Sequence, residues 1–308
     1  MRSDARSGSL SRPRHRRRRR SRALWCAGQR GRRRFARFRE AGRKTEDWLT
    51  LRRGDAPLLV SLPHTGVYIP DECAAGLVSP ALARHDADWH IDLLYSFASE
   101  LGATTVHTAL SRTVVDVNRD PSGASLYPGQ ATTGLIPIET FDGRPLYRSG
   151  AAPSPEEVER RKKLYFEPYH AALTEELARL RSLHNCVVLY DCHSIRSVIS
   201  RLFPGELPVF NIGTNNGKAC DATLSERIAA ICGASQWPHV VNGRFTGGWI
   251  TRAYGRPKEG IHAVQMELAM RGYLRDESEP PPWDADFAKP IQQTLRAVLE
   301  ACLGFARS

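Results

Sequence analysis

Three apolar runs in this chain end in, or contain, side chains that carry out acid–base and metal chemistry. One run leads into His64, a second into Asp191, Cys192 and His193, and a third holds Glu267 among apolar neighbours. A buried strand that presents polar groups at its carboxyl end is how an open α/β sheet builds an active site. Two histidines at strand ends and a carboxylate on another strand therefore predict a hydrolytic metal site. The three runs span residues 58–62, 187–190 and 261–268.

A catalytic metal site of the zinc type needs three protein ligands and leaves one position for water. Besides the two histidines, residues 86–92 offer carboxylates at the start of an expected helix. Such acids also occur there without a metal, because carboxylates cap helices and complement the helix dipole. Glu267 is a candidate general base, since burial in an apolar strand raises the pKa of a carboxyl group. The alternative for Glu267 is a structural ion pair with an arginine.

Arginines cluster at two places that suit a ligand with carboxylate groups. Arg112 and Arg119 flank an expected strand that leads into Asn118, and Arg244 and Arg252 lie in a glycine-rich segment. A planar guanidinium binds a carboxylate through two parallel hydrogen bonds, which lysine cannot reproduce. The alternative is that these arginines are surface residues or form ion pairs with neighbouring acids.

Signatures of other catalytic classes are missing from the sequence. It contains no G-x-S-x-G turn, no Walker A loop and no G-x-G-x-x-G motif. Cys192 and His193 are adjacent, but neighbours on a strand point to opposite faces, which disfavours a thiol–imidazole pair.

The basic charge of the chain is concentrated at its beginning. Of the formal net charge of +11, residues 1–44 contribute +16, from 17 Arg and one Lys against Asp4 and Glu40, so residues 45–308 carry −5. Like charges at this density repel, and the segment buries too little apolar area to order its backbone. We expect residues 1–44 to be a disordered extension, either non-native through an upstream start codon or simply solvated. An arm that binds nucleic acid is the third alternative, because arginine runs neutralise phosphates.

Cysteine usage and hydropathy indicate a cytoplasmic protein. The seven cysteines are odd in number and scattered, without a C-x-x-C pair, which argues for reduced thiols. No run of about 18 apolar residues would span a membrane, and no apolar segment near the start is long enough for an export signal. We expect neither a membrane nor a nucleic-acid partner for the folded part.

Strands alternate with helices over residues 45–308, which predicts one α/β domain with a mixed, mainly parallel sheet between helices. The long segment 120–155 shows no periodicity and should be functional or flexible. Strands are expected at 57–62, 104–107, 113–117, 187–190, 208–212, 240–241, 249–251 and 261–268, and helices at 80–102, 155–184, 222–232 and 283–303.

Over residues 48–300 the chain resembles the N-formylglutamate amidohydrolase (N-formylglutamate deformylase) family. The arginine-rich beginning has no counterpart in this resemblance. The matching blocks are SLPHTG (61–66), DADWHIDLLY (86–95), LSRTVVDVNRDP (110–121), LYPGQATTGLIP (126–137), YDCHSIRS (190–197), RLFPGELPVFNIGT (201–214), NGRFTGGWITRAYGRP (242–257) and HAVQMELAM (262–270).

The resemblance implies metal-dependent hydrolysis of N-formyl-L-glutamate to formate and L-glutamate, a step in histidine degradation. A more remote likeness to zinc carboxypeptidases implies a zinc-exopeptidase-like fold and suggests roles for individual residues. In that plan His64 and His193 bind the metal, Glu267 is the base, and Arg119 with Asn118 grips one substrate carboxylate. The candidates for the other carboxylate are Arg112, Arg244 and Arg252.

The remaining metal ligand cannot follow the carboxypeptidase pattern H-x-x-E, because Val67 stands where the glutamate would be. Asp88 is the candidate, since it starts the helix after the His64 loop, with Asp86 and Glu72 as alternatives. Such a set suits one divalent ion, zinc first, with cobalt and manganese also accepted. Two other functions stay open: a metal-dependent deacylase or carboxypeptidase for another N-acyl amino acid, and a nucleic-acid binder acting through the tail.

Overall fold

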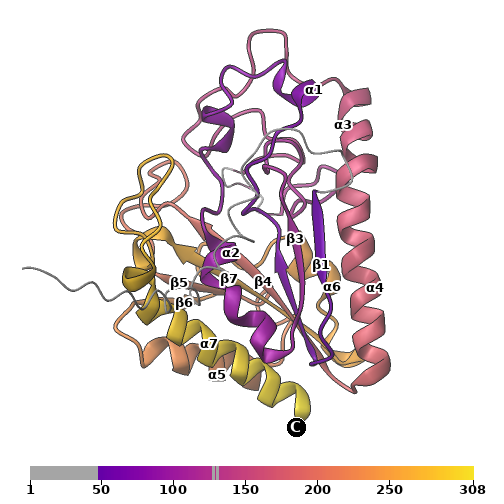
Figure 1. The fold of residues 1–308 in the computed structure, drawn as a ribbon, viewed down its shortest axis with the longest axis vertical. Helices are drawn as coiled ribbons and strands as arrows, with labels where there is room; N and C mark the ends of the chain where they lie inside the picture. The colour runs from indigo at the N-terminus through magenta and orange to yellow at the C-terminus, as the bar shows by residue number, and fades with distance from the viewer. Residues whose placement is uncertain (1–47, 127–128, 130–131) are drawn as a thin grey trace, which may run out of the picture. The chain divides into compact units, whose positions relative to one another are not determined.

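The computed structural model describes residues 48–126, 129 and 132–308 of the chain. The expectations for residues 1–44 lie outside this part. The described residues contain one sheet of seven strands, ordered β1-β3-β2-β4-β7-β5-β6 (Figure 1). The strands are β1 (Leu49–Arg52), β2 (Leu58–Leu62), β3 (Thr104–Thr108), β4 (Val187–Ile195), β5 (Phe210–Gly213), β6 (His239–Val241) and β7 (Ile261–Ala269).

The central strands β3, β2, β4 and β7 run parallel to one another. Towards the edges, β1 pairs antiparallel with β3, β5 pairs antiparallel with β7, and β6 is parallel to β5. The predicted α/β fold with a mixed, mainly parallel sheet is therefore confirmed. Parallel strands place their carboxyl ends at the same edge of a sheet, so the polar groups that follow them meet there.

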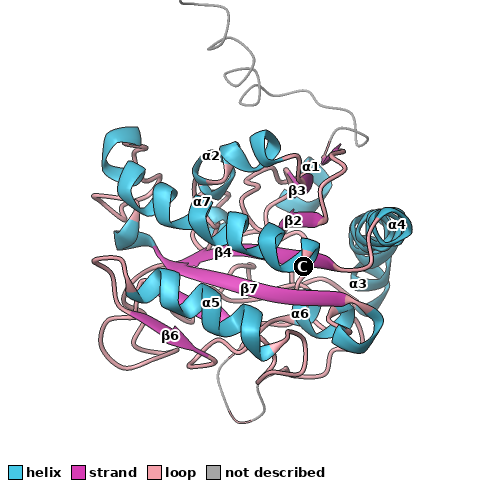
Figure 2. Ribbon diagram, turned by 90° about the horizontal axis from the view of Figure 1, so that it is seen from below, coloured by secondary structure: helices cyan, strands magenta, loops and turns pink. Residues whose placement is uncertain are grey.

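Helices cover both faces of the sheet (Figure 2). One face packs against α2 (Ile91–Leu94), the 3-10 helix η4 (Ser96–Leu101), α5 (Ala222–Gly233) and α7 (Ala285–Arg307). The opposite face packs against α3 (Pro155–Arg161), the π-helix η5 (Lys162–Phe166), α4 (Glu167–Leu183) and α6 (Trp249–Tyr254). Short helices in the connections are α1 (Asp71–Ala74), η3 (Leu82–Arg84), η6 (Pro257–Glu259) and η7 (Met270–Gly272).

The long helix expected over 155–184 is continuous and begins where the sequence signals place it. The Ser154 hydroxyl accepts a hydrogen bond from the Glu157 N–H at 3.3 Å, and acids occupy the first turn. The π-helical turn η5 lies just before Pro168, whose missing N–H interrupts an α-helical hydrogen-bond ladder.

The sheet face under α4 changes from apolar to polar along the strands. On β4 the residues Val187 and Leu189 pack into the core of that face, and the next two on the same side are Asp191 and His193. On β7 the same alternation leads from Ile261 and Ala263 to Gln265 and Glu267. Successive strand residues point to opposite faces, so this period of two assembles the polar groups on one side. Cys192 lies in the apolar core of the other face, apart from His193, as its position predicted.

Three predicted elements are wrong, each because a tertiary contact decides the local conformation. The helix expected over 80–102 is broken: the Asp88 N–H donates to the His64 carbonyl at 3.0 Å, and His90 is left-handed with φ 61°. Residues 113–117 form a buried connection in place of a strand, with the Asp116 N–H donating to the Leu135 carbonyl at 2.8 Å. Residues 249–251 begin helix α6, where the Ile250 N–H donates a hydrogen bond to the Asn118 side-chain oxygen at 2.7 Å.

None of the helices in the described part of the chain combines the length and apolar character needed to cross a membrane. The six cysteines that fall in this part are free thiols.

Candidate metal centre and catalytic cavity

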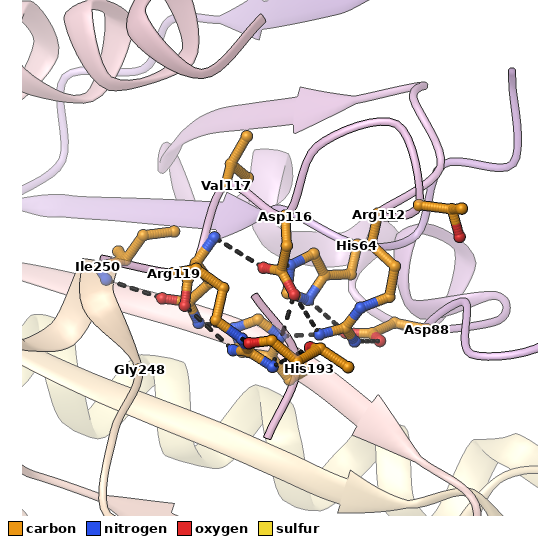
Figure 3. Close-up of polar contacts among 12 residues, drawn as sticks. His64, Asp88, Arg112, Asp116, Val117, Arg119, His193, Gly248 and Ile250 are labelled. Carbon is orange, nitrogen blue, oxygen red and sulfur yellow. Dashed lines mark hydrogen bonds and ion pairs between the residues drawn. The ribbon is translucent and has the colours of Figure 1, made fainter. Parts of the chain in front are cut away.

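His64, Asp88 and His193 come together at the carboxyl ends of β2 and β4: His64 follows β2, and His193 lies near the end of β4 (Figure 3). One nitrogen or oxygen atom from each lies within 4.8 Å of the others, and all three side chains are buried. The His193 Nδ1 lies 3.0 Å from Asp88 Oδ2, and the His64 Nδ1 lies 3.7 Å from the same oxygen. The three groups thus converge on one point.

The alternatives to Asp88 lie elsewhere. Asp86 Oδ2 accepts a hydrogen bond from the Phe141 N–H at 2.7 Å, and its other oxygen lies 3.3 Å from the Arg196 guanidinium. Glu72 is exposed on the short helix α1. Of the three acids considered from the sequence, Asp88 is the one that joins the two histidines within the described residues.

Each of the two histidines has its own buried carboxylate beside Nε2, the ring nitrogen that faces away from the centre. His64 Nε2 lies 2.7 Å from Asp116 Oδ1, and His193 Nε2 lies 2.9 Å from Asp191 Oδ2. Asp191 is held in turn by the Ser61 hydroxyl, which donates to its Oδ1 at 2.8 Å. Carboxylates behind metal-binding histidines fix the ring orientation and the tautomer. Here they direct Nδ1 of both rings to the centre.

The residues at this centre fit a divalent metal ion. The His64 Nδ1 is buried and has no hydrogen-bond partner among the described residues. A buried polar atom without a partner is costly, and a cation at the point where the three groups converge would be its partner. Two imidazoles and one carboxylate are also a three-ligand set that catalytic zinc-type sites use, with one position left open.

Burial and close ion pairs together shift the pKa values of Asp116 and His193. Burial opposes the charge of Asp116, but Arg112 at 2.7 Å and Arg119 at 3.5 Å outweigh it and keep the pKa of Asp116 well below its usual range. Burial also disfavours the protonated form of His193, yet Asp191 and Asp88 raise the pKa of His193 well above its usual value. Two carboxylates therefore favour positive charge at this point, whether from a proton or from a metal ion.

Glu267 lies beside the centre, and Gln265 orients it. Burial raises the pKa of Glu267 to about 7. The Gln265 side-chain N–H donates to Glu267 Oε2 at 3.2 Å, while the Gly248 N–H donates to Gln265 Oε1 at 2.7 Å. A backbone N–H can only donate, so it fixes the Gln265 oxygen toward Gly248 and the Gln265 nitrogen toward Glu267. One carboxylate oxygen of Glu267 is thereby occupied.

A cavity opens over these groups. Its lining includes His64, His193 and Glu267, four arginines and the apolar side chains of Phe141, Ile195, Leu202 and Phe245. The four arginines are Arg112, Arg119, Arg201 and Arg244.

Two of the predicted anion-binding residues have other contacts. Asn118 reaches the cavity wall, but its oxygen accepts from the Ile250 N–H at 2.7 Å and its nitrogen donates to Asp191 at 3.2 Å. Arg252 is not among the cavity-lining residues; its guanidinium donates to the Gly247 carbonyl at 2.8 Å. In the glycine-rich turn, Gly248 lines the cavity and packs closely against Asn118: a Cβ there would lie only 2.4 Å from the Asn118 nitrogen.

The sequence did not predict the roles that four residues have in the site: Asp116, Asp191, Gln265 and Arg201. A signal existed for two of them, because Asp191 and Gln265 each lie two residues before His193 and Glu267 on the same strand face. Asp116 lies in a connection and not on a strand, so no strand alternation points to it. Arg201 lies in a loop and carried no spacing signal.

Most of the chain matches the model of a known protein family. The family model described as N-formylglutamate amidohydrolase matches residues 56–274, well over half of the chain. The chain belongs to the N-formylglutamate amidohydrolase family. This confirms the family resemblance, and the residues described above all lie within the matched segment.

This chain matches nearly the whole length of several members of the N-formylglutamate amidohydrolase family. A protein named N-formylglutamate deformylase from Pseudomonas aeruginosa is 48% identical over 263 residues, which is 85% of this chain and 98% of that protein. One of the same name from Pseudomonas putida is 47% identical over 258 residues, 83% of this chain and 96% of that protein. The crystal structure of N-formylglutamate amidohydrolase from Ralstonia eutropha superposes with a TM-score of 0.71 at 26% identity, covering 84% of this chain and 98% of that one.

Proposed function

We propose that this protein hydrolyses N-formyl-L-glutamate to formate and L-glutamate with a divalent metal ion, as a step of histidine degradation. The observation that carries the proposal is the buried convergence of His64, Asp88 and His193, at a cavity that His64, His193, Glu267 and several arginines line. The two Pseudomonas relatives named N-formylglutamate deformylase support the choice of substrate.

His64, Asp88 and His193 would hold the metal, for which zinc, cobalt and manganese are all suited by the donor set. When bound, the metal lowers the pKa of a water molecule and polarises the formyl carbonyl group. The carboxylates of Asp116 and Asp191 keep the two imidazoles in the orientation that this requires, through hydrogen bonds of 2.7 and 2.9 Å.

Glu267 acts as general base and then as general acid. A carboxyl group with a pKa of about 7 can both accept and return a proton at neutral pH, so Glu267 can take the proton of the attacking water. The protonated carboxyl then returns that proton to the departing amine of glutamate. Gln265 holds Oε2 of Glu267, which leaves Oε1 to face the reactants.

The charge of the cavity suits a dianionic substrate. Among the residues that the structure describes, four arginines line the wall and Glu267 is the one acidic side chain of the lining. Asp88 and Asp116 pair with Arg112 at 3.4 and 2.7 Å, and the guanidinium groups that reach the cavity wall are the groups that attract carboxylates. N-formylglutamate carries two of them.

Formate release from N-formylglutamate tests the proposal, with N-acetylglutamate and N-formylaspartate assayed beside it, before and after removal of metal by a chelator. We expect formate from N-formylglutamate, loss of activity on chelation and recovery when zinc, cobalt or manganese is added. Faster hydrolysis of N-acetylglutamate would favour the alternative of a deacylase for another N-acyl amino acid. Unchanged turnover in the chelated protein would contradict metal dependence.

A further inference from the structure

The four arginines of the cavity wall fall into two groups by their contacts. Arg112 and Arg119 pair with Asp116, and Arg112 also lies 3.4 Å from Asp88. They therefore lie at the metal end of the cavity, and we call them the inner pair. Arg201 and Arg244 make contacts with the loops around residues 139–143 and 202. We call these the outer pair.

Arg201 is seated on a tight turn that also forms part of the cavity wall. Its guanidinium donates to the Thr140 carbonyl at 3.3 Å and pairs with the carboxylate of Glu139. Gly143 closes this turn with φ 86°, and a Cβ there would lie 3.2 Å from an Arg201 nitrogen. The turn thus holds the guanidinium in a defined place although the side chain is partly exposed.

The same turn reaches the inner pair. The Phe141 ring lies against the Arg112 guanidinium at 4.8 Å, while its neighbour Thr140 binds Arg201. Adjacent residues of one turn therefore contact an inner and an outer arginine, so the two positive groups lie along one wall. Apolar side chains of the lining, including Phe141, Leu202 and Phe245, accompany them.

The chemistry of the substrate matches this order of groups. In an N-formyl amino acid the α-carboxylate is borne by the carbon next to the amide nitrogen, so it stays near the reacting carbonyl. The side-chain carboxylate of glutamate lies farther away, at the end of a short hydrocarbon chain. With the formyl group at the metal centre, the α-carboxylate falls to the inner pair and the side-chain carboxylate reaches past the apolar side chains.

We propose that Arg201 binds the side-chain carboxylate of the substrate and so determines the preference for N-formylglutamate over N-formyl amino acids with neutral side chains. This inference rests on the proposed function. Glu139 and Thr140 position the guanidinium, and a planar guanidinium held in this way binds a carboxylate through parallel hydrogen bonds.

The test compares N-formylglutamate with N-formylglutamine, which has the same shape and no side-chain charge. The measured quantity is the ratio of kcat/KM for the two substrates, in the metal-loaded wild type and in Arg201→Met, Arg201→Lys and Arg244→Met. Arg144→Met is the matched control, because Arg144 lies on the same turn, is half exposed and pairs with Asp142 at 3.5 Å outside the cavity lining.

We expect Arg201→Met to lower the ratio of kcat/KM for N-formylglutamate over N-formylglutamine by about tenfold or more. A loss of this size is usual when a hydrogen bond to a charged group is removed. Turnover of N-formylglutamine should change little, and Arg201→Lys should keep part of the preference. If Arg201→Met does not fold, the partial loss in Arg201→Lys serves as the test. An unchanged ratio in both Arg201 variants, or a loss found only in Arg244→Met, overturns the inference. A wild type that releases no formate from N-formylglutamate overturns the proposed function, and the inference with it.

Discussion

His193 of β4 and Glu267 of β7 are register partners: their Cα atoms lie opposite each other in the parallel pair, on the face where Asp191 and Gln265 form the preceding pair. Neighbouring strands lie about 4.8 Å apart, so backbone pairing fixes the separation between a metal-binding candidate and a base candidate. No loop has to close for the two to meet. A site built on paired strands is rigid, which favours a defined position for the reacting water.

The two histidines should be required for metal binding and not for folding. We expect His64→Ala and His193→Ala to lose bound metal and formate release together, because each removes one of three ligands. Metal analysis by mass spectrometry and circular dichroism separate these effects. His239→Ala is the control, since His239 is exposed on β6. Full metal occupancy in both ligand variants would end the assignment.

Gln265 should matter for turnover without holding metal. Gln265→Leu removes the N–H donated to Glu267, so kcat should fall about tenfold, for a hydrogen bond worth about 1.4 kcal/mol. The acid limb of the kcat/KM profile should move to higher pH, because that hydrogen bond stabilises the charged carboxylate. Gln292→Leu is the matched control; Gln292 donates to the Leu94 carbonyl on the far face. A normal kcat and pH profile would make Gln265 a packing residue.

His170 should make the protein less stable in acid. It stacks between Phe166 and Tyr254, and burial lowers its pKa to about 4. In the unfolded chain His170 takes up a proton below its ordinary pKa of 6.5. In the folded protein it stays neutral until the pH falls to about 4. Unfolding free energy is therefore lost as pH falls through this window, by about 2 kcal/mol between pH 6.5 and 5.

The effect of His170 can be measured by urea unfolding at pH 7 and pH 5. His170→Gln should lose less stability on acidification than the wild type, with His239→Gln as a control that keeps the wild-type loss. Equal losses in all three proteins would mean that His170 is not the group responsible.

The arginine-rich segment 1–44 should be dispensable for catalysis, because every residue of the candidate site lies beyond it. A chain starting at Thr45 should keep the wild-type kcat/KM for N-formylglutamate. Fluorescence anisotropy with a labelled DNA duplex, at stated salt, measures whether the full chain has an affinity that the shorter chain lacks. A large loss of turnover on shortening would contradict this division of the chain.

The strands that carry the site were predictable because their signal is local. Mainly apolar runs at 58–62, 187–190 and 261–268 are typical of buried parallel strands, and polar groups towards their ends had to share one edge of the sheet. His64, His193 and Glu267 followed from that argument. Asp88 followed only from its place after the His64 loop.

The connections were not predictable in the same way, since distant contacts decide their conformation. Helix α6 was expected as a strand, but the Asn118 side chain caps its Ile250 N–H from far away in the sequence. Arg201 is placed by the turn at Glu139 and Thr140, and no spacing relates it to Glu267. Tertiary contacts of this kind override local propensity.

The measurement that tests the account most directly is single-turnover and steady-state formate release by Glu267→Gln, loaded with metal and compared with the loaded wild type. Glutamine keeps the shape of the side chain but cannot accept a proton. We expect full metal occupancy in both proteins and a kcat lowered by about a hundredfold or more in the variant. Near-normal turnover of N-formylglutamate by the metal-loaded variant would contradict the role of Glu267 and the mechanism built on it.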